Sequence, residues 1–123
     1  MDFKTRKIVK SGDLNGAGSL FGGRALEWID EEAAIYAFCQ LRTQHIVTKA
    51  MSAVNFMAPA KLGDIIEIGT EAVRAGTTSL TVRVLMRNKT TQEDIVKVDE
   101  VTFVNLDALG KPAPHGYKFN AVN

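Results

Sequence analysis

The chain contains 123 residues, of which 46% are hydrophobic and 24% charged, and its formal net charge is +1. This size and composition are typical of one folded domain, so we expect a single domain over residues 1–123 with an irregular tail over about 107–123. The small net charge gives no argument for binding nucleic acid or an anionic membrane surface, and no apolar run approaches the ~20 residues of a membrane span.

Hydrophobic periodicity predicts the regular elements in chain order. Residues 4–10 form a short candidate strand, and residues 20–41 form a long, proline-free helix in which apolar side chains recur every three or four positions. Strand-like runs follow at 45–57, 64–74, 79–87 and 95–106, with turn-forming residues between them. The run 79–87 alternates most regularly, since one of its two sides carries Leu80, Val82, Val84 and Met86.

This order of elements indicates an α+β domain in which a five-stranded antiparallel sheet surrounds one long central helix. The helix is apolar over most of its circumference, whereas a single sheet covers only one side of a helix. We therefore expect a second subunit to cover the remaining apolar surface, so that the protein is a homo-oligomer.

Two features bear on the location of the protein. The N-terminal segment has no apolar stretch after its basic residues, which argues against a secretory signal. The single cysteine, Cys39, excludes an internal disulfide and fits a reducing compartment. We expect a cytoplasmic protein.

The most informative segment is a glycine-rich turn that leads directly into the predicted helix, from Asn15 to Asp30. Amides at a helix start have no intrahelical acceptor and carry partial positive charge, so they suit a carbonyl oxygen that develops negative charge. Asp30, two turns into the helix and surrounded by apolar residues, is then a candidate general base or nucleophile. The alternative interpretation is an ordinary turn followed by a helix carboxylate on a solvated edge.

The same segment resembles the hot-dog-fold acyl-CoA thioesterases, specifically the group in which an Asn precedes a Phe-Gly-Gly helix start and an Asp follows within the helix. Asn15, Phe21-Gly22-Gly23 and Asp30 occur in that order and at matching spacing. One position departs from the family pattern, because several relatives have an acidic residue where this chain has Ser19. That difference bears on substrate preference more than on chemistry.

Later segments extend the resemblance, which covers roughly residues 5–106. Val54-Asn55-Phe56 with Pro59 and Gly63-Asp64 is similar to the family's second strand and the turn that leaves it, and the segment 76–80 is similar to the start of its fourth strand. The residues that the resemblance implies for substrate binding are Phe21, Gly22, Asn55, Gly76, Thr77, Thr78 and Ser79.

The resemblance implies a hot-dog fold and hydrolysis of an acyl-CoA thioester to a free acid and coenzyme A. The implied catalytic residues are Asp30, the Gly23 amide as oxyanion donor, and Asn15 arriving from the facing subunit. A homodimer would be the catalytic unit, with tetramers and hexamers as further options. Coenzyme A is part of the substrate and product, and no metal or other cofactor is implied.

Residue patterns alone leave two of these roles open. An Asn beside Gly is a common turn residue, because its side chain satisfies local backbone groups, so Asn15 is equally explained as part of a turn. Glu31 is close enough to Asp30 to be a minor alternative base. Glu27 and Glu31, with Arg24 one turn earlier, are typical of a solvated charged edge.

The other candidate catalytic and binding residues have less support in the sequence. Cys39 fits a packing role, and His45 and His115 without a cysteine cluster do not make a zinc site. No Gly-x-Ser-x-Gly elbow or dinucleotide fingerprint is present. Several cations are available for the phosphates of coenzyme A, none of them preferred: Lys61, Arg74, Arg83, Arg87 and Lys89.

Two rival functions remain beside hydrolysis. A hot-dog module can bind acyl thioesters or fatty acyl groups without catalysis, as a sensor or regulator, because fold does not fix function. A hydratase or dehydratase of the same fold would use a His at another position, and neither His45 nor His115 lies in the predicted helix.

Overall fold

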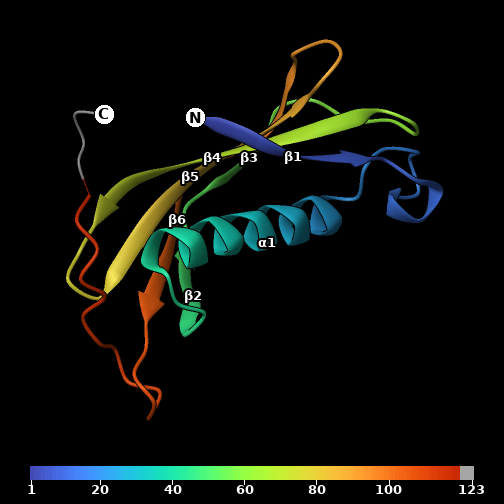
Figure 1. Ribbon diagram of the computed structural model, residues 1–123. Coiled ribbons are helices and arrows are strands. Elements are labelled where there is room, and N and C mark those ends of the chain that lie inside the picture. The colour runs from blue at the N-terminus through green and yellow to red at the C-terminus, as the bar shows by residue number, and fades with distance from the viewer. Residues whose placement is uncertain (120–123) are drawn as a thin grey trace.

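The computed structural model describes residues 1–119, which form one long helix, α1 (Gly22–Leu41), packed against an antiparallel sheet (Figure 1). The strands are β1 (Asp2–Ile8), β2 (Ile46–Met51), β3 (Val54–Phe56), β4 (Ile65–Ala75), β5 (Ser79–Asn88) and β6 (Asp94–Asn105), and a short 3₁₀ turn, η1, covers Ser11–Asp13. The sheet order is β1-β4-β5-β6-β2, with β3 also paired to β6. The predicted architecture of a sheet around one central helix is therefore confirmed.

The strand count differs from the prediction of five, because the run predicted at 45–57 divides into β2 and β3. The division occurs at Ser52, whose hydroxyl accepts a hydrogen bond from the Glu100 amide at 3.1 Å while its own amide donates to the Glu100 carbonyl at 2.8 Å. A side chain thus replaces one backbone partner of the ladder, as in a bulge, and the edge strand is interrupted there.

The hydrophobic core lies between α1 and the concave face of the sheet. Alternate residues of β5 point into it, and Leu80, Val82, Val84 and Met86 are all fully buried, as the alternation predicted. The helix contributes a buried stripe: Ala25, Trp28, Ile29, Ala33, Ala37 and Leu41. These positions recur every three or four residues, so one face of α1 is closed by its own sheet.

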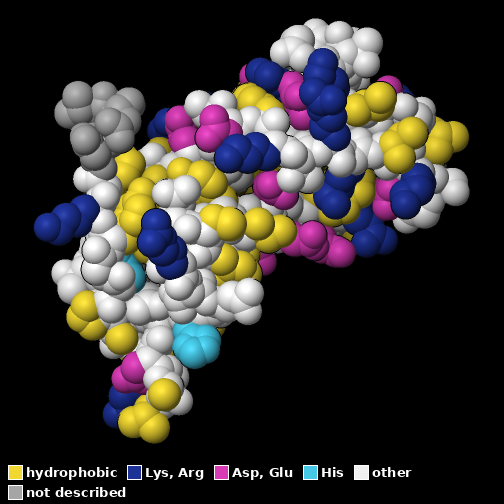
Figure 2. All heavy atoms as spheres, viewed as in Figure 1, with side chains coloured by type: hydrophobic (Ala, Val, Ile, Leu, Met, Phe, Trp, Pro, Cys, Tyr) yellow, Lys and Arg dark blue, Asp and Glu magenta, His cyan; other side chains and the backbone are white. Residues whose placement is uncertain are grey.

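The outward face of α1 is not closed by its own chain. Positions 23, 27, 31, 35 and 39 recur every four residues and are all exposed, and among them Ile35 is 45% exposed. In the view of Figure 2, apolar, acidic and basic side chains are mixed over the surface of the molecule. The helix is thus covered on one side only, which agrees with the expectation that another subunit packs here.

The segment 107–119 has no regular strand or helix, as expected for the tail, apart from an isolated bridge between Leu106 and Pro112. The last four residues of the predicted tail, 120–123, lie outside the described residues. Within the described part of the chain, the single long helix is too polar to serve as a membrane span.

Candidate active site

The start of α1 is fixed by backbone bonds that leave its first amides available. The Leu20 amide donates to the Ala60 carbonyl at 2.8 Å, and the Phe21 amide donates to the Asp13 carbonyl at 2.8 Å. The first bond into the helix comes from the Ala25 amide to the Phe21 carbonyl. Within residues 1–119, the amides of positions 22–24 therefore find no backbone acceptor, which is the normal state of a helix N-terminus.

Two exposed aromatic rings flank these amides. Phe21 is 56% exposed and its ring lies beside Gly23, where a Cβ atom would come within 2.6 Å of the Phe21 Cε2. The Phe56 ring, 57% exposed, lies 3.4 Å from the position of a Cβ at Gly22. Because neither glycine has a side chain, the two rings can lie on either side of the helix start. A hollow of about 270 Å³ opens at Gly23 and Phe21, with Asp13 and Arg24 among its other lining residues.

Asp30 lies on the flank of α1 that faces the edge strand β2, and it is half-buried. Its Oδ1 accepts a hydrogen bond from the Thr48 hydroxyl at 2.9 Å. In the described part of the chain, Thr48 is its one hydrogen-bond donor, and no Lys or Arg pairs with it. The neighbouring helix residues Ile29 and Ala33 are fully buried. Asp30 is therefore an unpaired carboxylate at the margin of the core, held by one neutral donor.

Thr48 has no distinguishing pattern in the sequence. It lies in an exposed edge strand that alternates weakly, and a Thr in a strand is ordinary. Only the packing of β2 alongside α1 brings its hydroxyl to Asp30, eighteen positions earlier in the chain.

Asn15 is exposed and lies in the turn before α1. Its Oδ1 accepts hydrogen bonds from the Ala17 amide at 2.9 Å and the Ser19 amide at 3.1 Å. The turn role that residue patterns suggested is therefore present. No hydrogen bond within residues 1–119 joins Asn15 to Asp30, so a single chain does not bring these two predicted catalytic residues together.

The predicted substrate-binding residues fall into two groups at opposite ends of α1. Phe21, Gly22 and Asn55, next to Phe56, lie near its N-terminal end. The turn 76–79 lies near its C-terminal end, where the tail residue Tyr117 donates to Gln40 at 3.2 Å (Figure 1). A ligand that contacts both groups of residues must therefore either extend along the helix or bind one group from each of two subunits.

The other acidic residues of the helix have partners or lie in solvent. Arg24 pairs with Glu27 at 3.2 Å, as the spacing predicted, and its Nε lies 3.3 Å from the Asp13 carboxylate. Glu31 is exposed. Glu32 accepts a hydrogen bond from the Thr5 hydroxyl at 2.6 Å. These contacts set Asp30 apart from Glu27, which pairs with a cation, and from exposed Glu31. Glu32 resembles Asp30 in its burial and its single hydroxyl donor, so the match to the family pattern is what favours Asp30 over Glu32.

A hollow of about 730 Å³ lies away from this site. It lies between β4, the C-terminal half of α1 and the tail, with Tyr36, Gln40 and Tyr117 among its lining residues. None of the predicted catalytic residues lines it. Within residues 1–119, no three His, Cys, Asp or Glu side chains gather as metal ligands would.

Comparison with known proteins assigns these features to a family. A model of the thioesterase superfamily matches residues 17–95 of the chain. The acyl-CoA thioester hydrolase YciA of Salmonella typhimurium is 30% identical over 115 residues, which cover 89% of this chain and 86% of that protein.

Solved structures are similar as well. An acyl-CoA hydrolase from Staphylococcus aureus, crystallised with butyryl coenzyme A, coenzyme A and coenzyme A disulfide, is 34% identical with a TM-score of 0.81, covering 89% of this chain and 66% of that one. A hexameric hotdog-fold thioesterase of Campylobacter jejuni is 30% identical with a TM-score of 0.81, covering 93% and 90%.

Proposed function

The chain belongs to the thioesterase superfamily, and from that premise we propose that it hydrolyses acyl-CoA thioesters to a free carboxylic acid and coenzyme A. The observation that carries the proposal is the arrangement of α1, which presents unpaired amides at its start and an unpaired, half-buried carboxylate two turns later. Thioester hydrolysis needs an oxyanion donor and a group that activates water or attacks directly, and these two features meet that need.

In the proposed reaction, the thioester carbonyl oxygen accepts a hydrogen bond from the Gly23 amide. Asp30 takes a proton from a water molecule, and the resulting hydroxide adds to the carbonyl carbon. The tetrahedral intermediate then expels the thiolate of coenzyme A, which takes the proton back from Asp30, and the acid is released. Thr48 holds Asp30 in place through its hydroxyl.

The spacing of the two groups favours general-base catalysis over an anhydride. Asp30 lies seven positions after Gly23, which is about 10 Å along a helix axis at 1.5 Å per residue. A carbonyl group bound at the amide does not fill that gap by itself, whereas a carbonyl group followed by one water molecule does. Hydrolysis in ¹⁸O-labelled water under single-turnover conditions tests this choice, because an anhydride would place label in the Asp30 carboxylate.

We further propose that a second copy completes each site. The edge strand β2 has four consecutive exposed residues, 47–50, and it lies beside the helix flank that carries Asp30. An exposed edge of this kind readily pairs with another strand. A partner that docks here would place its own Asn15 near Asp30. The Campylobacter jejuni relative is a hexamer, which supports a homo-oligomer built from such dimers.

The proposed substrate contacts follow the two groups of residues described above. Phe21, Gly22 and Asn55 would contact the acyl thioester near the helix start, and the turn 76–79 of a neighbouring subunit would contact coenzyme A. Coenzyme A enters as part of the substrate and product, and the proposed steps use no metal or redox cofactor. We place the reaction in the cytoplasm, a location that the single cysteine supports.

The test is release of free thiol from a panel of acyl-CoAs of increasing chain length. We expect steady turnover with at least one member, and the panel reads the chain-length preference at the same time. Binding of coenzyme A esters with no thiol release would instead identify a non-catalytic acyl-CoA-binding module and would reject the proposal. A hydratase finds no support, since both ring nitrogens of His115 are already bonded and His45 is exposed outside the helix.

A further inference from the structure

The C-terminal strap, residues 113–119, runs along the end of the sheet and is bonded to the turn 76–79. The His115 amide donates to the Thr77 carbonyl at 3.2 Å, and the His115 Nε2 lies 2.8 Å from the Ser79 carbonyl oxygen. The buried side chain of Asn105 holds the start of the strap, since its Nδ2 donates to the Ala113 carbonyl at 3.0 Å. The strap therefore lies against the turn that the family resemblance places in substrate binding.

The two ring bonds of His115 define one protonation state. The Tyr117 amide donates to Nδ1 at 2.9 Å, which requires a lone pair on Nδ1. The Ser79 carbonyl can only accept, so Nε2 must carry the proton. The ring is therefore neutral, with its hydrogen on Nε2, and it links the turn on one side to the strap on the other.

The strap in turn reaches the C-terminal half of the helix. The Tyr117 hydroxyl donates to the Gln40 side chain at 3.2 Å, and the Tyr117 ring meets the His115 ring edge-on at a centroid distance of 6.2 Å. The backbone carbonyls of Thr77, Thr78 and Ser79 all accept hydrogen bonds, and the donor to Thr78 is the Asn105 amide at 2.7 Å. The backbone of the turn is thus fixed by β6 and the strap together, while Thr77 itself stays exposed.

We propose that His115 is a positioning residue for substrate binding: its neutral, Nε2-protonated ring locks the C-terminal strap onto the turn 76–79 and so holds that turn in the shape that binds acyl-CoA. This proposal rests on the proposed function, since it assigns a role to the same substrate. His115 touches neither of the predicted catalytic groups at the start and middle of α1, so its effect falls on KM and not on kcat.

The lock needs the free lone pair on Nδ1, because that lone pair accepts the hydrogen bond from the Tyr117 amide. The groups bonded to the ring, from the β4–β5 turn and from the strap, are uncharged: Thr77, Ser79 and Tyr117. From the helix, neutral Gln40 faces the strap, and the charged residues of the adjoining hollow are Asp2, Glu71, Arg83 and Lys118.

The experiment compares four variants with the wild-type protein in steady-state kinetics at neutral pH. His115→Ala removes both ring bonds. His115→Gln keeps a donor that reaches the Ser79 carbonyl, and His115→Asn keeps an acceptor at the position of Nδ1. His45→Gln is the matched control, because His45 is exposed and bonds to neither the turn nor the strap through its ring.

We expect His115→Ala to raise KM roughly tenfold at neutral pH, as for the loss of one hydrogen bond, with kcat changed less than about twofold. His115→Gln and His115→Asn should recover part of the KM, because each keeps one of the two ring bonds. His45→Gln should match the wild type in both KM and kcat. An independent readout is the ring's NMR spectrum, which distinguishes the Nε2–H from the Nδ1–H tautomer.

An unchanged KM in folded His115→Ala overturns the proposal, and so does an Nδ1–H tautomer in the wild type. If His115→Ala does not fold, the KM of the two amide variants and the tautomer of the wild-type ring decide in its place. A wild-type protein that hydrolyses no acyl-CoA rejects the proposed function and, with it, the claim about KM. The tautomer would then still show whether the ring links strap and turn.

Discussion

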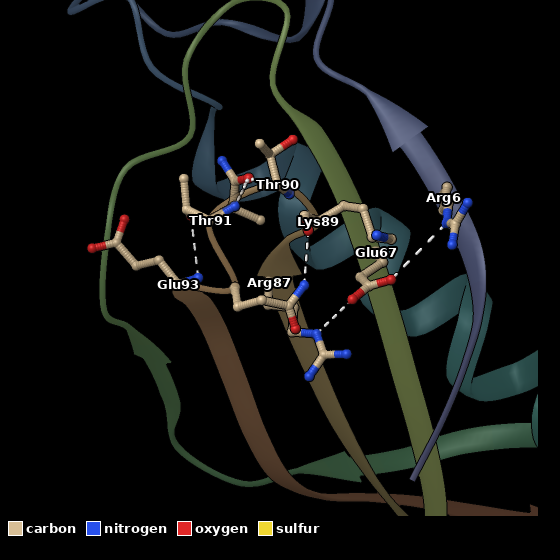
Figure 3. A network of polar contacts seen from close by, with 9 residues as sticks. Arg6, Glu67, Arg87, Lys89, Thr90, Thr91 and Glu93 are labelled. Atoms are coloured by element: carbon tan, nitrogen blue, oxygen red, sulfur yellow. Dashed lines mark hydrogen bonds and ion pairs between the residues drawn. The ribbon is translucent and has the colours of Figure 1, made fainter.

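Two carboxylates of this molecule, Asp30 and Glu67, each lie beside fully buried apolar residues, but their hydrogen-bond partners differ. Glu67, on the convex side of β4, is 3% exposed and accepts a hydrogen bond from the Arg87 Nε at 2.6 Å, with the Arg6 Nε at 4.0 Å (Figure 3). The Arg87 guanidinium also lies 3.6 Å above the centre of the Phe3 ring. Asp30 has one neutral partner, the Thr48 hydroxyl.

This difference in partners indicates a structural role for the charge of Glu67 and a reactive role for Asp30. Burial acts to raise the pKa of Glu67, but the hydrogen bond and the positive charge of Arg87 outweigh it, so the pKa of this carboxyl is lowered. A carboxylate held in this way stays charged and accepts no proton during a reaction. Asp30 faces no cation in the described chain, and one of its oxygens has no hydrogen-bond partner there. It is the carboxylate that can act as a base.

The largest expected effect is on catalysis at Asp30. Asp30→Asn keeps the shape of the side chain and removes the base, so kcat should fall by roughly 10²- to 10⁴-fold, the usual range for a positioned acid–base group. Thiol release measures the loss, and circular dichroism should show an intact fold. Near-normal turnover would move the chemistry elsewhere, with Glu31 the first alternative; Glu31→Gln is the matched control and should retain activity.

A substitution at Gly23, the proposed oxyanion donor, should lower kcat nearly as much as the substitution at Asp30. In Gly23→Val, the new side chain would stand where the thioester carbonyl binds, and we expect kcat to fall by roughly 10²- to 10³-fold. The Phe21 ring must also turn away, which its exposure permits. Gly16→Val is the control, because a Cβ at Gly16 meets nothing within 4 Å. A folded Gly23→Val protein with wild-type kcat and KM would place the oxyanion donor elsewhere.

Subunit mixing tests whether Asp30 works with a partner's Asn15. Asn15→Asp keeps the acceptor that fixes the turn but loses the amide donor, and Asp30→Ala loses the base. After random exchange of two nearly inactive proteins, about half of the dimers are mixed, and one of the two sites in each carries neither change. About a quarter of the wild-type activity should return.

Mass spectrometry establishes that exchange has occurred. No recovery after confirmed exchange would mean that Asn15 and Asp30 act within one chain, or that Asn15 serves only the turn that its Oδ1 holds together.

A smaller effect is expected at the single partner of Asp30. Thr48→Val preserves the volume of the side chain and removes the hydroxyl, so Asp30 loses its donor and kcat should fall about tenfold, the equivalent of one hydrogen bond. Thr48→Ser should restore most of the activity. If Val and Ser variants both match the wild type, the 2.9 Å contact has no part in orienting the base.

The smallest effect on activity is expected at Glu67. Glu67→Gln should leave kcat unchanged but lower the free energy of unfolding by about 1–3 kcal/mol at neutral pH, because a charged hydrogen bond is lost. Since the folded-state pKa of Glu67 lies below the ordinary 4.5, its contribution is present above that pH and is lost as the pH falls through the folded value. Urea unfolding at several pH values should show the two proteins converging in acid; a constant difference would contradict this.

The sequence by itself determined the elements and their general arrangement. Alternation in 79–87 and the three- and four-residue steps of 20–41 follow directly from strand and helix geometry, so β5 and α1 were predicted to within two residues at each end. The short break at Ser52 was missed, because it depends on a side chain that replaces a backbone partner of a strand far along the chain.

Only the tertiary structure distinguished the partners of Asp30 from those of Glu67. It also identified Thr48, the positions of the Phe21 and Phe56 rings, and the link that His115 makes between the strap and the turn 76–79. Each of these rests on contacts between residues distant in the chain, such as Glu67 with Arg87 or His115 with Ser79. A carboxylate among apolar residues looks the same in sequence whether a cation or a hydroxyl faces it. Local periodicity follows from the backbone, whereas the partner of a charged group is decided by which strands the fold places side by side.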